Sequence, residues 1–469
     1  MTQQPVEHDK QPKARKPLWR RILKWTLRVV VGLLVIAAIG WGIFSYTSAK
    51  ALEDEIAKIQ AVGQPLTFAQ LDRSRPKVSE ADDAAPYYKA ALALRRSSTH
   101  ERVAELLNKL KGFAETRGTT IHPEVAAEIE SVLAANALSL EMIDRGSQRA
   151  QCAYDFGLSN GIPVMLPQLS HSRTLAMLLY LRTRWLAQQG LASEAADSFV
   201  SSLRMMRMFD RQPVLITYMV NVACTALCVD SLPTVLGAGQ LSDQELAKLE
   251  LSLADVGQSL DMRRVFLAER VYMLELWRNL IAPQRRLELG DAANLPDTAP
   301  PSNFLSRPMF RMMMVRQLQM YDQYISASGK KWPEFRDAMR ACKQPSSGIF
   351  GVFVQILAPS FDQCHRLAGR AVGSLRSAEV AVKVERYRLA NGRLPKSLDE
   401  LRQFTGIDLP SDPFTGRDLV FKSQGDAFMV YSIGEDRSDD GGPLQQPQKD
   451  WGVSVRLFRV STTTTTQAN

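Results

Sequence analysis

Three aspartates near the C-terminal end have the residue type and the spacing of calcium ligands. Asp436, Asp439 and Asp440 fall within five residues of sequence, and glycines at positions 434, 441 and 442 make the segment flexible. Ca²⁺ takes about six to eight oxygen ligands from carboxylates and backbone carbonyls, and glycine-rich bends can supply both. Acidic turns of this kind are also common without any ion. The residues therefore leave two hypotheses open, a calcium site and a solvated acidic turn.

The residues outside this segment give little sign of catalysis. The chain has no phosphate-binding loop, no G-x-G-x-x-G turn and no H-E-x-x-H pair. His171 lies between Ser170 and Ser172, but a helix at this position would direct the two serines away from the imidazole ring. We therefore expect no cofactor other than calcium, and we predict a non-catalytic protein.

The five cysteines are few, and odd in number, for an exported protein. Cys224 and Cys228 are four residues apart on a predicted helix with no histidine within forty residues, so we interpret them as buried packing residues and not as metal ligands. Cys342 and Cys364 bracket a predicted loop and could form a disulfide in an oxidising compartment. The sequence does not decide whether they do.

The N-terminal segment predicts a membrane anchor. Residues 29–49 contain no charge, and 21 residues of helix at about 1.5 Å each match the roughly 30 Å hydrocarbon core of a bilayer. Residues 1–28 carry eight basic side chains, so the positive-inside rule keeps this tail in the cytoplasm and places everything after Ala49 outside. A cleaved signal peptide is the alternative, because Ala49-Lys50-Ala51 has the small-x-small form of a cleavage site.

The distribution of charge argues against nucleic acid as a partner. Lysine and arginine exceed aspartate and glutamate by 58 − 49 = 9, but residues 1–28 alone contribute 8 − 2 = 6 of this excess. The remaining 441 residues are nearly neutral, so the basic composition describes the N-terminal tail and not the rest of the chain. We therefore expect the lipid bilayer to be a partner and DNA or RNA not to be one.

The elements that must position these residues are mostly helices. After a linker at 50–81, apolar residues recur at intervals of three and four through residues 82–342, which predicts an irregular helical bundle or solenoid with a proline-rich loop at 283–308. Gly190, Ala195 and Phe199 have the spacing of a tetratricopeptide hairpin, although no second copy follows. The predicted helices start with one near Pro86 and continue at 101–117, 123–145, 167–189, 192–209, 214–227, 243–254, 262–281, 309–325 and 332–341.

The C-terminal part predicts a small α+β module at 361–460, followed by a disordered tail at 461–469. A helix from about residue 360 to 390 carries apolar residues on two opposite faces, so we expect it to lie between a sheet and the helical domain. Three antiparallel strands are predicted at 419–422, 427–433 and 453–460, with Gln424-Gly425-Asp426 as the turn of the first hairpin. The predicted fold class is thus mainly α, with a long helix on a three-stranded antiparallel sheet.

The C-terminal module also contains several motifs in a fixed order, at residues 387–395, 398–401, 412–416, 431–436 and 439–442. Together they resemble the C-terminal half of type II secretion major pseudopilins (major pseudopilin G) over about residues 375–442. The resemblance implies a long helix packed on a small antiparallel sheet and a calcium-binding loop, which would be the segment with Asp436, Asp439 and Asp440. The whole chain resembles uncharacterised bacterial membrane-anchored helical proteins that end in such a pseudopilin-like module.

These features predict a single-pass protein of the bacterial cytoplasmic (inner) membrane with its C-terminal domains in the periplasm. We expect a non-catalytic binding or scaffold protein of the cell envelope that has another envelope protein as its partner. Two alternatives stay open: an accessory component of a type II secretion or pilus-like system, and an enzyme with an unrecognised site in the helical domain. A deep pocket with converging charged residues and shifted pKa values would favour the enzyme.

Overall fold

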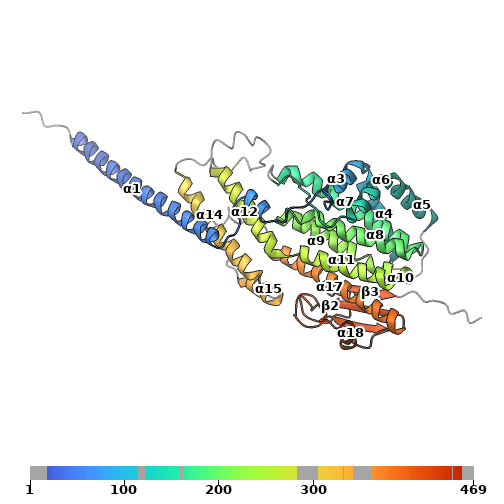
Figure 1. The fold of residues 1–469 in the computed structure, drawn as a ribbon. Coiled ribbons are helices and arrows are strands. Elements are labelled where there is room, and N and C mark those ends of the chain that lie inside the picture. Colours follow the sequence, from blue (N-terminus) through green and yellow to red (C-terminus); the bar gives the residue numbers. More distant parts are fainter. Residues whose placement is uncertain are drawn as a thin grey trace, which may run out of the picture.

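The computed structural model describes residues 18–114, 122–158, 162–281, 305–330, 332–341, 361–445 and 447–456. The chain is mainly helical and has a three-stranded antiparallel sheet near the C-terminal end, as predicted. Figure 1 shows a long N-terminal helix, a group of helices, and a small sheet that lies against a long helix. The tail at 461–469 and the predicted proline-rich loop up to residue 304 lie outside the described residues.

The first helix, α1 (Leu18–Ala61), is a single element of 44 residues. At about 1.5 Å per residue it is roughly 66 Å long, which is more than a bilayer core requires. The first part of the predicted span 29–49 stands away from the other helices in Figure 1, and the most apolar window of α1 has no buried residue. Near the end of the span, Ser48 is buried. The helix is long and apolar enough to span a membrane. It also continues into the predicted linker 50–81, so the span and the start of that linker are one continuous helix.

A small hydrophobic cluster, which we call the arm cluster, fixes the C-terminal end of α1. The cluster forms where α1 packs on α14 (Arg307–Ala327), which in turn packs on α12 (Met262–Ile281). Trp277 is 1% exposed, and its ring centroid lies 5.9 Å from that of Phe310. The members of the cluster are Ile59, Leu66, Leu274, Trp277, Phe310, Met313, Met314 and Leu318. Packed side chains therefore hold the exposed helix on the helical domain.

The predicted helices of the helical domain occur in the predicted order, but two of them are divided and α10 (Leu232–Ala238) was not predicted. The predicted helix 192–209 is α8 (Ala192–Met205) followed by the 3-10 helix η2 (Met206–Phe209). The predicted helix 123–145 is two helices, α5 (Pro123–Ala135) and α6 (Ala137–Ser147), which meet at Asn136. The Asn136 side chain donates to Val132 O at 2.9 Å and accepts from Thr99 Oγ1 at 2.9 Å. Such side-chain hydrogen bonds compete with those of a helix, so the helix is interrupted at Asn136. Further helices are α2 (Phe68–Arg73), α3 (Ala85–Leu94), α4 (Thr99–Ala114), α7 (Ile162–Gln188), α8 (Ala192–Met205), η2 (Met206–Phe209), α9 (Leu215–Val229), α10 (Leu232–Ala238), α11 (Asp243–Ser259) and α15 (Trp332–Ala341).

The hairpin that the sequence predicts around Gly190 is formed by α7 and α8, which pack on each other. Gly190 has a φ of 74°, a left-handed conformation that glycine adopts without strain. Ala195 and Phe199 are both fully buried between these helices and their neighbours. The spacing of the three residues therefore marks a real helix-turn-helix unit within the domain.

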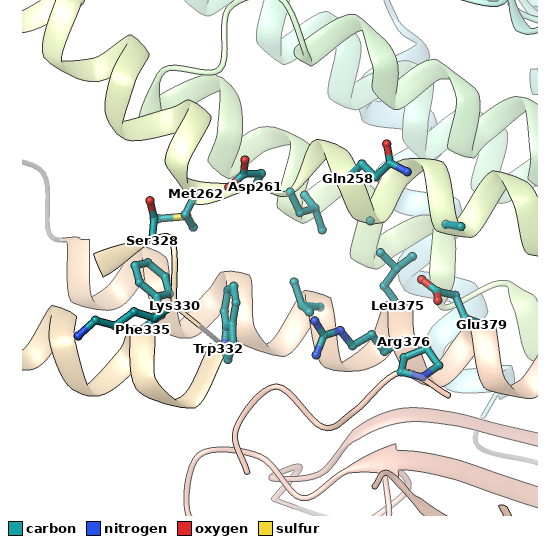
Figure 2. A pocket seen from close by; sticks show the side chains of 15 residues that line it. Gln258, Asp261, Met262, Ser328, Lys330, Trp332, Phe335, Leu375, Arg376 and Glu379 are labelled. Carbon is teal, nitrogen blue, oxygen red and sulfur yellow. The ribbon is translucent and has the colours of Figure 1, made fainter. Parts of the chain in front are cut away.

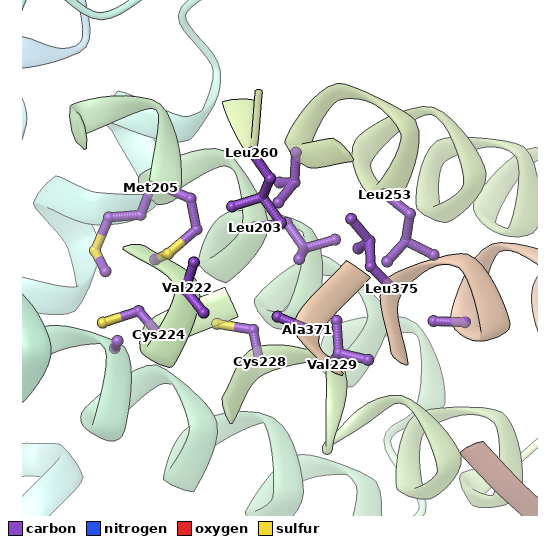
Figure 3. Packing of buried hydrophobic residues seen from close by; sticks show 14 of the residues in the cluster. Leu203, Met205, Val222, Cys224, Cys228, Val229, Leu253, Leu260, Ala371 and Leu375 are labelled. Atoms are coloured by element: carbon purple, nitrogen blue, oxygen red, sulfur yellow. The ribbon is translucent and has the colours of Figure 1, made fainter. Parts of the chain in front are cut away.

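Helix α9 is apolar enough to resemble a second membrane span, but it lies in the core. It packs against α7 and α17 (Phe361–Asn391). In the most apolar 18-residue window of the segment Leu215–Ala238, 61% of the residues are buried. Cys224 and Cys228 have free thiols and lie in the buried hydrophobic cluster of Figure 3. Burial raises the pKa of the Cys228 thiol to about 11. Both cysteines pack in the core, as predicted. Cys364 also has a free thiol, whereas Cys342 lies outside the described residues.

The long helix α17 lies between the sheet and the helical domain, as its two apolar faces predict (Figure 1). It contacts α9 and α11 on one side and strands β2 (Ala427–Ser432) and β3 (Trp451–Arg456) on the other. The strand order is β1-β2-β3, with β1 at Val420–Gln424, and Gln424 pairs with Ala427 across the predicted turn. Short helix α18 (Leu398–Thr405) packs on α17.

The outer edge of β3 is covered by α10. A Cβ atom added to Gly237 would lie 2.8 Å from Arg456 O, so only a glycine allows helix and strand to approach this closely. Strand β3 therefore attaches the sheet to the helical domain. Strand β1 lies at the opposite edge of the sheet.

Charged side chains join α11 to α17 at a contact that we call the charged seam. Lys383 Nζ contacts Glu250 Oε1, and Arg386 Nη1 donates to Glu250 Oε2 at 2.8 Å. Arg386 Nε also donates to Asp243 Oδ1 at 2.8 Å. The Lys383 side chain is only 7% exposed, so its ammonium group depends on the Glu250 carboxylate for a partner.

Glu269 is a buried carboxyl group of α12 that contacts the start of α9. It is 5% exposed, and its Oε2 atom accepts a hydrogen bond from the Leu215 amide at 2.8 Å. Burial raises the pKa of Glu269 to about 7, and the hydrogen bond from Leu215 opposes this rise only in part. The fold thus holds this carboxyl with a pKa near neutrality.

We expect the free energy of unfolding to fall as the pH rises from about 4.5 to about 7. Folded Glu269 keeps its proton until the pH reaches about 7, whereas the unfolded chain loses it near its ordinary pKa of about 4.3. The stabilisation is thus complete below the unfolded pKa and is lost as the pH passes the folded pKa. The Glu269→Gln variant keeps an acceptor for the Leu215 amide. Its free energy of unfolding should decrease less over this pH range than that of the wild type.

Denaturant unfolding of the wild type and of Glu269→Gln between about pH 5 and pH 8 measures the effect. The exposed Glu194→Gln on α8 is the control and should follow the wild type. An unchanged slope in Glu269→Gln would show that the buried carboxyl does not retain its proton.

Candidate binding site

The predicted calcium ligands lie in the loop between β2 and β3, where lysines contact them. Lys449 Nζ lies 3.3 Å from Asp436 Oδ2 and 3.3 Å from Asp440 Oδ1. Asp439 faces a different lysine, with its Oδ2 atom 3.0 Å from Lys422 Nζ. The structure therefore brings Asp436 and Asp440 together around one ammonium group and directs Asp439 to another.

Asp450 is a further carboxylate of this loop, and it was not among the predicted residues. It is fully buried, and its Oδ2 atom accepts from the amides of Asp440 at 3.1 Å and Gly442 at 2.8 Å. Its Oδ1 atom is buried and has no hydrogen-bond partner among the described residues, and burial raises the pKa of Asp450. A bound cation would supply the partner that this oxygen lacks.

The chemistry of these oxygens suits calcium, but their present arrangement does not form a closed metal site. Across the described residues, no three His, Cys, Asp or Glu side chains converge as a metal ion requires. Calcium binding would need the loop to exchange its contacts with Lys449 for the ion. Calcium binding at Asp436, Asp439 and Asp440 stays a prediction.

A calcium titration of the full chain, followed by thermal unfolding, tests this prediction. We expect the ion to raise the melting temperature of the wild type by a few degrees and to leave that of Asp440→Asn unchanged, because binding to the folded state alone stabilises it. Lys449→Gln removes the competing ammonium group and should increase the response. Equal melting of the wild type with and without the ion would reject the site.

A second candidate site is a cavity of about 370 Å³ where α17 meets the helical domain. This volume falls in the range of about 300–1,000 Å³ that is usual for small-molecule sites. The cavity is lined by the end of α11, the start of α12, the segment after α14, α15, α17 and Pro410 (Figure 2). Residues far apart in the sequence therefore meet in it.

Arg376 and Glu379 bring charge into this cavity from α17. Arg376 Nη1 donates to Ser411 O at 2.7 Å, and burial lowers the pKa of this guanidinium group. Glu379 lies beside Gly257 of α11, where an added Cβ would be 3.6 Å from Glu379 Oε1. Burial raises the pKa of Glu379 to about 7, although the positive charges of Arg376 and Lys383 oppose the rise. No hydrogen bond or ion pair joins Glu379 to another described residue.

Two aromatic side chains of α15 form an apolar wall of the cavity. The Trp332 ring stacks on His365 of α17, with centroids 5.1 Å apart and an interplanar angle of 14°. Phe335 meets the same imidazole edge-on at 4.9 Å. His365 is thereby enclosed between the two rings and α17, and it holds Trp332 at the edge of the cavity.

The charged side chains that line the cavity are Asp261, Lys330, Arg376 and Glu379. Ser328 is its only lining serine among the described residues, and its hydroxyl donates to Ile325 O at 2.7 Å. No histidine or cysteine lines the described part of the cavity.

The chain does contain one enzyme-like motif. Residues 157–161 have the G-x-S-x-G spacing of a nucleophile elbow. Such an elbow places its serine between a strand and a helix. Residues 152–157 form no strand, although α7 follows, and Ser159 itself lies outside the described residues. The described surroundings therefore lack the strand that this motif needs.

Neither Arg376 nor Glu379 stands out in the sequence, because both are ordinary charged residues of a helix. One signal was present: Glu379 falls between Leu375 and Val382, on an apolar face that the sequence assigns to packing. A carboxyl on such a face is either paired or functional.

Comparison with protein-family models, with curated proteins and with solved structures finds no match for the chain.

Proposed function

We propose that the protein is anchored in the bacterial cytoplasmic membrane by residues 29–49 and acts in the periplasm as a non-catalytic binding or scaffold protein. The observation that carries this proposal is the exposed apolar part of α1, which no other described segment covers. In water such a surface is costly, whereas a bilayer would cover it. The basic tail at 1–28 supports an orientation with the N-terminus in the cytoplasm.

The attachment of α1 supports a scaffold that is held close to the bilayer. Arg311 Nη1 donates to Ser45 O at 3.3 Å, and Trp41 Nε1 donates to Leu305 O at 3.4 Å. Both contacts occur near the end of the predicted span, where α14 begins. A continuous helix with these contacts would keep the domain at a fixed distance from the membrane.

Fractionation of the native cells and paired reporter fusions test the anchor. We expect the chain to stay in the membrane fraction after alkaline carbonate extraction, and a reporter that is active only outside the cytoplasm to work at the C-terminus. Leu33→Arg with Ile36→Arg should release the protein, because each charge costs about 2.5–3.5 kcal/mol at the centre of a span. Val62→Arg, beyond the helix at a site 67% exposed, is the matched control and should stay in the membrane.

A soluble, shortened product in the wild type would show cleavage as a signal peptide and contradict the anchor. A C-terminal reporter that is active only in the cytoplasm would contradict the orientation. Cleavage would still leave the domain outside the cytoplasm, whereas the second result would assign its binding sites to the cytoplasm.

A role as an accessory component of a type II secretion or pilus-like system is the second candidate. The packing of α17 on a three-stranded antiparallel sheet agrees with the module that the resemblance implies. Strand β1 at the edge of this sheet could accept a strand from another protein. Crosslinking in the native envelope, followed by mass spectrometry, should then recover pseudopilins, and their absence among the crosslinked proteins would reject this role.

A further inference from the structure

The cavity beside α17 offers a positioned group that binds anions. The bond from Arg376 Nη1 to Ser411 O fixes the guanidinium group at the cavity wall. Among the described residues, its Nε and Nη2 atoms have no partner, and neither is a buried unpaired atom. A guanidinium fork with two available donors can hold a carboxylate by two parallel hydrogen bonds.

The rest of the cavity is suited to an apolar body. Trp332 and Phe335 line it from α15, and Val372 and Leu375 line it from α17 (Figure 2). The stacking on His365 prevents Trp332 from turning away. With a volume of about 370 Å³, the cavity holds a small molecule and not a folded partner.

We propose that this cavity binds a small organic acid, with its carboxylate on Arg376 and its apolar part against Trp332 and Leu375. The proposal rests on the binding role proposed above and names the class of ligand. It does not depend on the membrane anchor. No bond in the ligand is made or broken.

The charges around the cavity favour a singly charged anion over a cation. Lys330 adds a second positive charge at the edge of the cavity. Asp261 is already engaged, because its Oδ1 atom accepts from the Arg263 amide at 2.9 Å at the start of α12. An amine in this cavity would face Arg376 and Lys330, with Asp261 and Glu379 to compensate, and Glu379 holds its proton up to a pH of about 7.

Glu379 should make the binding depend on pH. Its protonated form can donate a hydrogen bond to a bound carboxylate, whereas its ionised form repels it. The charged groups that face Glu379 or share its cavity come from α17, α11, the residue before α12 and the segment after α14. They are Arg376, Lys383, Glu250, Asp261 and Lys330. Affinity should therefore decrease as the pH rises through about 7.

The first test uses the full chain in lipid nanodiscs and three probes of similar size that share a phenyl ring. Phenylacetate is the anion, phenylacetamide the neutral analogue and phenethylamine the cation, and saturation-transfer NMR measures their binding at about pH 6. We expect phenylacetate to bind at least about tenfold more tightly than the other two, because a hydrogen-bonded charge pair is worth about 1.5–3 kcal/mol. Empty nanodiscs account for partition of the probes into lipid.

Variants then assign the binding to this cavity. Arg376→Gln should weaken phenylacetate binding at least about tenfold, and Arg376→Lys should give an intermediate loss. Glu379→Gln should bind as well as the wild type at about pH 6 and lose the decrease at higher pH. Arg370→Gln is the matched control on the same helix, because Arg370 pairs with Glu435 and does not line the cavity.

Three results would overturn the proposal. They are failure of phenylacetate to bind the wild type at millimolar concentration, equal or tighter binding of phenethylamine, and undiminished binding to a folded Arg376→Gln variant, as judged by circular dichroism. The first two use only the wild type and so do not depend on the folding of any variant. None of them bears on the membrane anchor, which the fractionation experiment tests separately.

Discussion

Replacement of Trp277 by alanine is expected to lower the free energy of unfolding by about 4 kcal/mol and to detach the C-terminal end of α1. Trp277 is 1% exposed in the arm cluster, where it packs against Phe310, and its Nε1 atom donates to Gln317 Oε1. Alanine would leave a large cavity and would also leave the buried Gln317 amide without this donor. Denaturant unfolding measures the first effect.

Hydrogen exchange over residues 50–66 measures the second effect, because a loosened α1 should exchange faster while the sheet module stays protected. Two positions near the end of α1 provide the control pair. Ile59→Ala, at a site 1% exposed, should loosen the same contact by about 3 kcal/mol, whereas Val62→Ala, at a site 67% exposed, should change stability by less than about 0.5 kcal/mol. Equal exchange in Trp277→Ala and the wild type would show that the arm cluster does not hold the helix.

Replacement of Glu250 by alanine is expected to lower the free energy of unfolding by about 3 kcal/mol. Glu250 is the partner of both Lys383 and Arg386 in the charged seam. Its loss would leave the Lys383 ammonium, on a side chain 7% exposed, without a countercharge between α11 and α17. Chemical unfolding followed by circular dichroism measures the loss.

A surface ion pair on the same helix gives the control. Lys248 pairs with Asp197 at 2.6 Å, but both side chains are exposed, so Lys248→Ala should cost less than about 1 kcal/mol. The double variant Glu250→Met with Lys383→Met should recover much of the stability lost in Glu250→Ala, because it removes the unpaired charge and keeps the volume. A loss of the same size in Lys248→Ala would show that burial does not matter at the seam.

The sequence predicts those elements whose formation depends on neighbouring residues. Helix α15 has the predicted bounds of 332–341, and α17 differs from its prediction by one residue at each end. Pro, Gly and capping residues act within one turn, so local sequence sets such boundaries. The division at Asn136 escaped prediction because its side chain bonds to Thr99, which is 37 positions away.

The functional residues were harder to predict, because contacts between residues that are remote in the sequence bring them together. Asp436 and Asp440 are close in sequence, and the structure does bring them together, although around Lys449. Asp450 joins their loop only because β3 pairs with β2 and buries it. Arg376 and Glu379 become a site only where α11 and α15 meet α17.

The sequence by itself determined the exposed apolar helix, the helical character of the middle of the chain and the helix between two layers. These follow from the period of apolar residues and from the lack of charge in one segment, which are local properties. Only the tertiary structure decided which charges meet and how deeply they are buried. Burial and distance between remote residues set the pKa of Glu379 and the available donors of Arg376, and no local pattern encodes either quantity.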